Sequence, residues 1–172
     1  MQMNIIVACD REWGIGKNGR LLCHIPGDLK HFKEITMGKT VVMGRVTLES
    51  LPGGHGLPGR RNIVLTKNPD FQAEGAEVVH DLDELDKALE GTPTDDVFVI
   101  GGANIYSLLY PRCRNMYVTQ IEETFGADRF FPRNLDESHR FEMESHSEYM
   151  EENGIRYRFV KYVKVPPEGG RR

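Results

Sequence analysis

The chain has 172 residues, of which 28% are charged and 39% hydrophobic, and its net charge is -4. This length fits one domain that buries roughly 70% of the surface of the unfolded chain. No apolar run approaches the about 20 residues that a membrane-spanning helix needs. Lys and Arg are spread along the chain and form no nucleic-acid footprint. We therefore expect a soluble protein that binds small molecules, with neither a membrane nor a nucleic acid as partner.

The first strand and the cysteines predict a cytoplasmic location. Residues 1–10 carry no Lys or Arg before the short apolar run 5–8, so they indicate a strand and not a signal peptide. Cys9, Cys23 and Cys113 are odd in number and lack a CxxC pairing. This pattern is typical of reduced thiols and not of a disulfide framework or a zinc site.

Strand-like runs alternate with segments of helical spacing over most of the chain. Alternating strands and helices are joined by crossover connections and form a mainly parallel sheet with helices on both faces. We expect strands at residues 4–9, 40–43, 62–65, 77–79 and 97–100, and helices at residues 28–37, 82–90 and 103–110.

The last third of the chain is strand-like without an intervening helix. We expect strands at residues 115–122, 141–150 and 155–165, with Asn153-Gly154 as a hairpin turn. The fold class is therefore α/β: a single domain with a mainly parallel central sheet and a C-terminal antiparallel hairpin. This domain covers residues 1–165, and the Pro- and Gly-rich residues 166–172 are predicted to be a disordered tail.

Residues 14–19 read Gly-Ile-Gly-Lys-Asn-Gly and match the GxGxxG phosphate-binding motif after the first strand. In a Rossmann unit the last glycines of this motif open a helix. Here residues 20–25 lead directly into Pro26, which cannot lie inside a helix. The segment therefore favours a mobile Gly-rich loop over a Rossmann phosphate loop.

Asp28 lies in the first turn of the helix expected at residues 28–37. A carboxylate at this place commonly caps its helix. Leu29 and Phe32 lie on adjacent faces of the same helix, and such an apolar wall desolvates a carboxylate unless a hydrogen-bonding ligand faces it. A fused amino-pyrimidine ring offers a matched pair of N–H donors. The residues alone leave both interpretations open.

Four segments, in order and spacing, resemble dihydrofolate reductases, and the resemblance runs from about residue 4 to residue 165. They are similar to the family's substrate helix, its second strand with the following helix, its glutamate-binding turn and its cofactor-binding strand end. In this sequence they are Ile-Pro-Gly-Asp-Leu at 25–29 with Phe32, Val-Met-Gly-Arg at 42–45 with Thr47, Glu49 and Ser50, Leu-Pro-Gly-Arg at 57–60 with Asn62, and Val-Ile-Gly-Gly at 99–102 with Ile105 and Tyr106.

The resemblance implies NADPH-dependent reduction of 7,8-dihydrofolate to 5,6,7,8-tetrahydrofolate in support of one-carbon metabolism. Hydride goes to the pterin C6 and a proton to N5, and the scheme requires no metal. Asp28 is implied as the one catalytic carboxylate, holding the pterin 2-amino group and N3 with support from Thr119. Arg60 is implied to clamp the α-carboxylate of the glutamyl tail. The other implied substrate contacts, for which plain core packing is an equal alternative, are Ile6, Ala8, Leu29, Phe32, Leu51, Leu57 and Ile100.

The cofactor site is implied in the same way. Gly101-Gly102 removes side chains where the backbone approaches phosphate, and a helix starts near Ala103; an ordinary Gly-Gly turn is the alternative. Cations near the adenosine 2′-phosphate favour NADPH over NADH. The implied cofactor contacts are Ala8, Ile15, Gly16, Gly44, Arg45, Thr47, Leu65, Thr66, Lys67, Ile100, Gly101, Gly102, Ala103, Asn104, Ile105 and Tyr106.

Residues 14–21 correspond to the family's mobile loop, which closes over the nicotinamide, and Asp128 is implied to hydrogen-bond the closed form. Leu22-Cys23 replaces the family's usual Pro-Trp, and Trp13 is the candidate to fill part of that space. Leu48 replaces a common Trp, which affects packing only. Asn104 stands where some members have Arg, which leaves more of the 2′-phosphate contact to the other cations.

We expect a monomer with dihydrofolate and NADPH as its partners. Two alternatives differ in function class: a reductase of a related heterocycle on the same fold, such as the pyrimidine reductases of riboflavin synthesis, and a non-catalytic folate- or nucleotide-binding module. The first is not expected to carry Asp28, Phe32 and Arg60 together. The loss of Trp at Cys23 favours the second.

Overall fold

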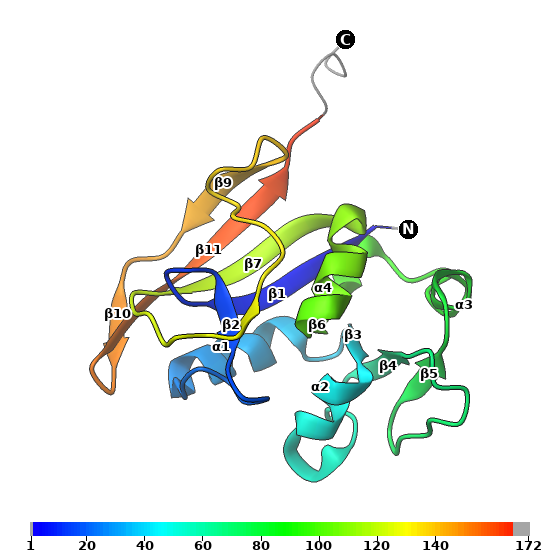
Figure 1. Ribbon diagram of the computed structural model, residues 1–172. Helices are drawn as coiled ribbons and strands as arrows, with labels where there is room; N and C mark the ends of the chain where they lie inside the picture. The colour runs from blue at the N-terminus through cyan, green and yellow to red at the C-terminus, as the bar shows by residue number, and fades with distance from the viewer. Residues whose placement is uncertain (1, 167–172) are drawn as a thin grey trace.

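The computed structural model describes residues 2–166. Its main sheet contains β1 (Met3–Cys9), β3 (Thr40–Gly44), β4 (Arg61–Leu65), β5 (Glu77–Val79), β6 (Val97–Gly101), β7 (Cys113–Ile121), β9 (Phe141–His146), β10 (Met150–Glu152) and β11 (Ile155–Lys164). The spatial order is β10-β11-β7-β1-β6-β3-β4-β5, and β9 also pairs with β11 (Figure 1). Except for the strand expected at residues 141–150, the predicted strands are thus present, with ends that differ by at most two residues.

Strand directions confirm the predicted architecture. The neighbours β7, β1, β6, β3, β4 and β5 are all parallel, whereas β11 runs antiparallel to β7. The single strand expected at residues 141–150 is wrong, because β9 and β10 are separate and both pair with β11. Between them the Ser147 hydroxyl accepts the Phe159 N–H at 2.9 Å, so a side chain interrupts the backbone ladder.

The helices are α1 (Pro26–Thr36), α2 (Arg45–Ser50), α3 (Leu82–Ala88) and α4 (Ala103–Leu109), with 3-10 turns η1 (Pro52–Gly54), η2 (Thr94–Asp96) and η3 (Tyr110–Arg112). The helix predicted from residue 28 begins at Pro26, because proline at the first helical position lacks only an N–H that would have no helical partner. The short helix α2 was implied by the family resemblance alone.

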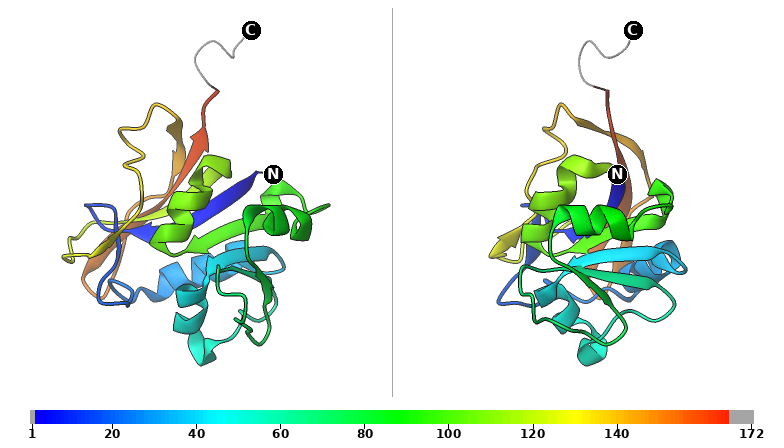
Figure 2. Two further views of the ribbon diagram at one scale, coloured as in Figure 1. Left: turned by 45° about the vertical axis from the view of Figure 1, so that its right-hand side comes forward. Right: turned by 90° about the vertical axis from the view of Figure 1, so that its right-hand side faces the viewer.

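Side chains alternate between the two faces of the sheet and define its layers. Ile5 and Val7 of β1 pack with Leu85 of α3 and Leu109 of α4 in the largest core cluster. Ala8 points to the opposite face, where a smaller cluster forms at the start of α1. Helices therefore cover both faces, as predicted, with α1 and α4 on opposite sides of the sheet (Figure 2).

The glycine-rich segment is more ordered than the predicted loop. Its first residues form β2 (Gly14–Gly16), which pairs with β8 (Arg129–Phe130), so the expectation of a loop throughout residues 14–21 is wrong. Beyond β2, Lys17 and Arg20 are bridged around a tight turn in which Asn18 and Gly19 have positive φ values of 51° and 74°. Asn-Gly is the preferred dipeptide for such a turn.

Among residues 2–166, no helix has the length and apolar character needed to cross a bilayer. Of the predicted tail at residues 166–172, all but Pro166 lie outside the described residues. The disorder of that tail stays a prediction.

Candidate active site

Asp28 and Thr119 form the centre of the candidate site. Asp28 lies in the first turn of α1, and Thr119 lies on β7 with only 3% of its surface exposed. The Thr119 hydroxyl donates to Asp28 Oδ1 at 2.6 Å. The helix has Ile25 as its N-cap and shows no side-chain capping bond, so Asp28 does not cap its own helix. Its second carboxylate oxygen remains available to a ligand.

Three surrounding effects set the proton affinity of this carboxyl. Burial raises the pKa of Asp28, the hydrogen bond from Thr119 lowers it, and the negative charge of Glu152 raises it again. Burial is the largest of the three, so the net effect is a raised pKa. A carboxyl with this property in a partly open site is a candidate for proton transfer.

The apolar residues predicted to contact the substrate are mostly only partly buried. Leu29 is 46% exposed although it belongs to α1 next to the core. Across from it, Leu51, Leu57 and Ile100 are partly buried against one cluster, and Ala8 against another. Phe32 is half-buried, whereas Ile6 is buried in β1. Except for Ile6, these side chains are partly exposed to solvent, so they are not fully used in packing the core.

Arg60 follows the turn after η1 and points back to the far end of α1. Its Nε donates to the Pro58 carbonyl at 3.0 Å and its Nη1 to Thr36 Oγ1 at 3.3 Å. It has no acidic partner within the described part of the chain, and burial lowers its pKa. The neighbouring Arg61 instead makes two hydrogen bonds to Glu77, at 2.6 and 2.9 Å, as expected of a surface charge. Arg60 is thus positioned and free to bind an anion.

The predicted cofactor residues gather where parallel strands end. Gly44, Leu65 and Gly101 are the last residues of β3, β4 and β6, and the pairing aligns Gly44 with Leu65. A side chain at Gly44 would lie 2.9 Å from Ile105, and side chains at Gly101 and Gly102 would lie 3.5 and 3.4 Å from Thr47 Oγ1. Glycine at Gly44 therefore makes room for Ile105 of α4, and the Thr47 hydroxyl lies close to Gly101 and Gly102, at the edge where α/β sheets bind ligands.

Other predicted cofactor residues are less tightly linked to this edge. Tyr106 is 3% exposed and donates its hydroxyl to the Ile6 carbonyl at 2.8 Å, so it supports β1 from within the core. Ile15 packs against the same core cluster, and Gly16 ends β2. Ala103 starts α4 and is half-buried, whereas Asn104 is exposed.

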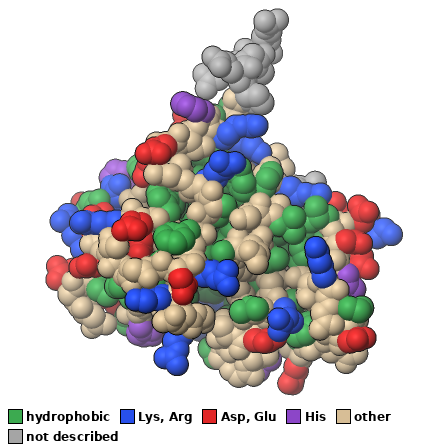
Figure 3. Space-filling model, viewed as in Figure 1, with side chains coloured by type: hydrophobic (Ala, Val, Ile, Leu, Met, Phe, Trp, Pro, Cys, Tyr) green, Lys and Arg blue, Asp and Glu red, His purple; other side chains and the backbone are tan. Residues whose placement is uncertain are grey.

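The predicted 2′-phosphate cations lie at the outer part of the same edge. Arg45 begins α2 and forms an ion pair with Glu49, while Lys67 is exposed just after β4. Beside them the His80 ring donates from Nδ1 to the Thr66 carbonyl at 2.8 Å. The sequence reasoning missed His80, although its position directly after β5 was a usable signal. On the face drawn in Figure 3, cationic side chains are interspersed with acidic ones and form no single basic patch.

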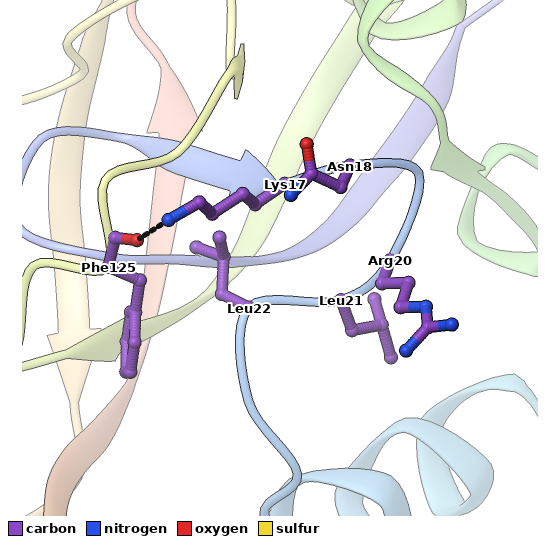
Figure 4. Close-up of a pocket in the computed structure, with 6 residues that line it drawn as sticks. All are labelled: Lys17, Asn18, Arg20, Leu21, Leu22 and Phe125. Carbon is purple, nitrogen blue, oxygen red and sulfur yellow. Dashed lines mark hydrogen bonds between the residues drawn. The ribbon is translucent and has the colours of Figure 1, made fainter.

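The turn beyond β2 is joined to the loop that precedes β8. The Asn18 N–H donates to Asp128 Oδ2 at 2.9 Å, which agrees with the implied role of Asp128. Lys17 Nζ reaches the Phe125 carbonyl at 3.5 Å across an open hollow of about 510 Å³ (Figure 4). This hollow lies between the two loops and is lined by Lys17, Asn18, Arg20, Leu21, Leu22 and Phe125.

The expectation that Trp13 fills the space left at Cys23 is wrong. Trp13 packs against Phe131 and Tyr162, with ring centroids 6.1 and 6.3 Å apart, in the largest core cluster. Cys23 belongs to the separate cluster at the start of α1. Leu48 is buried in the core, which agrees with a packing role.

A partly buried carboxyl with a raised pKa on α1, together with glycines at the carboxyl ends of the parallel strands β3 and β6, is typical of an α/β enzyme that binds a nucleotide. Residues 2–164 match the family described as dihydrofolate reductase. The chain belongs to the dihydrofolate reductase family.

Individual relatives agree with this assignment. The chain is 42% identical to dihydrofolate reductase type 3 of Salmonella typhimurium over 77% of this chain and 79% of that protein. It is 37% identical to dihydrofolate reductase of Bacillus subtilis over 94% of both chains. A solved dihydrofolate reductase from Enterococcus faecalis, complexed with NADP(H) and RAB-propyl, superposes with a TM-score of 0.85 at 36% identity and covers 96% of this chain and 97% of that one.

Family membership makes the chain an NADPH-dependent oxidoreductase that acts on dihydrofolate. The matches support neither alternative, the heterocycle reductase or the non-catalytic module.

Proposed function

We propose that the chain reduces 7,8-dihydrofolate to 5,6,7,8-tetrahydrofolate with Asp28 as its one catalytic carboxylate. The observation that carries the proposal is the 2.6 Å hydrogen bond from Thr119, which fixes a partly buried carboxylate at the start of α1, next to the apolar slot that we propose for the pterin ring. The ionised carboxylate accepts two hydrogen bonds, from the pterin 2-amino group and N3. Such charge-assisted bonds contribute about 1.5–3 kcal/mol each and orient the ring.

Asp28 also promotes the uptake of a proton at N5. Its raised pKa keeps the carboxyl protonated to a higher pH than an exposed aspartate would be, so it can favour proton delivery through water. NADPH supplies the hydride that C6 receives. The slot residues Ala8, Leu29, Phe32, Leu51, Leu57 and Ile100 hold the ring and exclude water, with Ile6 behind them.

Arg60 binds the α-carboxylate of the glutamyl tail. It is partly buried, it has no acidic partner in the described part of the chain, and its guanidinium is steadied by Thr36. A planar guanidinium matches a carboxylate in bidentate geometry. The tail thus extends from the slot along α1.

The chain's own residues fit NADPH at the strand-end edge. Gly44, Gly101 and Gly102 carry no side chain at this edge, where phosphates would bind, and Thr47 Oγ1 lies beside the last two. Arg45 and Thr47 hold phosphates, and Thr66 with Lys67 meets the 2′-phosphate. The other proposed contacts with the cofactor are Ala8, Ile15, Gly16, Leu65, Ile100, Ala103, Asn104, Ile105 and Tyr106.

The enzyme acts as a monomer in the cytoplasm. Its three cysteines are free, and Cys9 and Cys113 are buried as thiols, which suits a reducing compartment. Light scattering of the purified protein measures the mass, and a dimer would contradict the monomer.

The direct test is oxidation of NADPH with dihydrofolate as the sole acceptor. We expect turnover by the natural chain and a strong loss in Asp28→Asn. If both the natural chain and Asp28→Asn bind NADPH but do not oxidise it with dihydrofolate, the protein would be a binding module. Activity on a pyrimidine substrate alone would indicate the heterocycle reductase.

A further inference from the structure

The first turn of α1 is held by a residue from the other end of the chain. Glu152, the last residue of β10, accepts the Gly27 N–H with Oε1 at 3.0 Å and with Oε2 at 3.2 Å. The Tyr157 hydroxyl donates to Glu152 Oε1 at 2.6 Å. Since Ile25 provides no side-chain cap, Glu152 satisfies an N–H that the helix start would otherwise leave to water.

Gly27 provides the space that Glu152 occupies. A Cβ atom at Gly27 would lie 2.1 Å from Glu152 Oε1 and 2.4 Å from the Tyr157 hydroxyl, far inside contact distance. Gly27 does not have a positive φ, so its backbone conformation does not require glycine. The absence of a side chain at Gly27 is therefore what allows the Glu152 carboxylate to bind the start of α1.

The same carboxylate acts on Asp28, the next residue after Gly27. The groups around Asp28 come from several elements: Thr119 of β7, Glu152 of β10, Tyr157 of β11 and Cys23 ahead of α1. Of these, Thr119 favours the ionised carboxylate and Glu152 opposes it. The Tyr157 hydroxyl stays protonated, since Glu152 and burial raise its pKa to about 12.

We propose that Glu152 is a positioning residue of the reductase, which fixes the first turn of α1 and extends the turnover of dihydrofolate toward alkaline pH. The inference rests on the proposed role of Asp28. Removal of the negative charge at Glu152 favours ionised Asp28, so proton delivery to N5 fails at a lower pH than in the natural chain. The hydrogen bonds of Glu152 maintain the geometry of the site, and its charge sets the pH range.

Glu152→Gln separates these two effects, because glutamine keeps an acceptor for Gly27 and Tyr157 but carries no charge. The matched control is Glu151→Gln, which removes an exposed carboxylate from the adjacent position. We expect kcat/KM for dihydrofolate, measured from about pH 5 to about pH 9, to keep its acid plateau in Glu152→Gln. At the alkaline end it should fall about two- to tenfold below the natural chain. Glu151→Gln should follow the natural profile.

A second variant, Gly27→Ala, tests the inference independently if Glu152→Gln does not fold. Gly27→Ala forces the Glu152 carboxylate away from the helix start, and alanine is well tolerated in a helix. It should move the alkaline limb in the same direction as Glu152→Gln. Unshifted profiles in both variants, or an equal shift in Glu151→Gln, would overturn the inference while Asp28→Asn remains impaired. Full activity of Asp28→Asn would instead overturn the role of Asp28 and the inference with it.

Discussion

Thr119 and Asp28 are 91 positions apart in the sequence and are joined by a 2.6 Å hydrogen bond between the threonine hydroxyl and Oδ1. Thr119 is buried on β7, whereas Asp28 opens toward the slot. The bond therefore links the rigid sheet to the helix that carries the carboxylate. It engages only Oδ1 and leaves the other carboxylate oxygen available to a ligand.

Asp28→Asn should leave a folded protein that binds NADPH but should cut turnover of dihydrofolate by about 10²–10⁴-fold near neutral pH, the range for loss of an acid–base group. Part of the loss should return at low pH, because substrate protonated in solution no longer needs the carboxyl. Steady-state rates across the pH range measure both effects. Turnover like that of the natural chain at neutral pH would remove Asp28 from the mechanism.

The same substitution should stabilise the free protein at neutral pH. Because the pKa of Asp28 is raised on folding, its contribution to stability is complete below its unfolded pKa and is lost as the pH rises through the folded pKa. A neutral amide avoids this loss. Thermal unfolding should show a higher Tm for Asp28→Asn at neutral pH, with the difference vanishing in acid. A lower Tm at neutral pH would mean that the ionised carboxylate stabilises the fold.

Thr119→Val keeps the shape of the side chain but removes the donor to Asp28. Since this hydrogen bond lowers the pKa of Asp28, the alkaline limb of kcat/KM should move to higher pH, opposite to the effect of Glu152→Gln. Loss of a hydrogen bond to a charged group costs about 1.5–3 kcal/mol, so the free energy of unfolding should also fall in Thr119→Val. An unchanged pH profile with an unchanged free energy of unfolding would contradict the role of Thr119.

The sequence predicts the alternating strands and helices because burial leaves a recognisable pattern of apolar residues in each of them. β1 and β6 are almost entirely buried, so their apolar runs indicated a parallel sheet. β8 has only two exposed residues and shows no alternation, which explains why its pairing with β2 was missed.

Local patterns also located Asp28 but not the groups that tune it. The apolar neighbours of Asp28 on one helix made it a candidate, while its catalytic role and the role of Thr119 came from the family resemblance. Glu152 contacts Gly27 from 125 positions away, and that contact depends on the register of the hairpin formed by β10 and β11. The Asn153-Gly154 turn fixes that register, but nothing in the sequence shows that the hairpin packs against α1, so Glu152 required the structure.

Arg60→Leu should raise KM for dihydrofolate strongly and change KM for NADPH little. Removal of one partner from a shielded charge pair costs about 2–5 kcal/mol, most of it in binding. The adjacent Arg61→Leu is the matched control, because Arg61 is engaged by Glu77 at the surface. A pterin without the glutamyl tail should not distinguish Arg60→Leu from the natural chain. If the tail-free pterin weakens as much as dihydrofolate, Arg60 is structural.

Cofactor choice should follow from the charges at the strand-end edge. The 2′-phosphate of NADPH carries charge that NADH lacks, and the proposed cations are Arg45 and the exposed Lys67. Exposed ion pairs contribute only about 0–1 kcal/mol each, but charge-assisted bonds from Arg45 to phosphate contribute more. Arg45 already pairs with Glu49, and that pair must loosen for the phosphate to bind. We expect a preference for NADPH of at least about tenfold, which falls as salt rises.

The double variant Arg45→Ala with Lys67→Ala should shrink this preference and affect NADH less, whereas Asn104→Arg should enlarge it. Lys87→Ala is the control, since Lys87 is an exposed cation in the last turn of α3. The opposite end of α3, its first turn, is the one that follows β5. The measurement is kcat/KM for both cofactors at two salt concentrations. The lysine control should leave the ratio unchanged, because charge far from the phosphate is screened within about 10 Å at 0.1 M salt. Equal use of the two cofactors by the natural chain would show that these cations do not read the 2′-phosphate, while dihydrofolate reduction itself would stand.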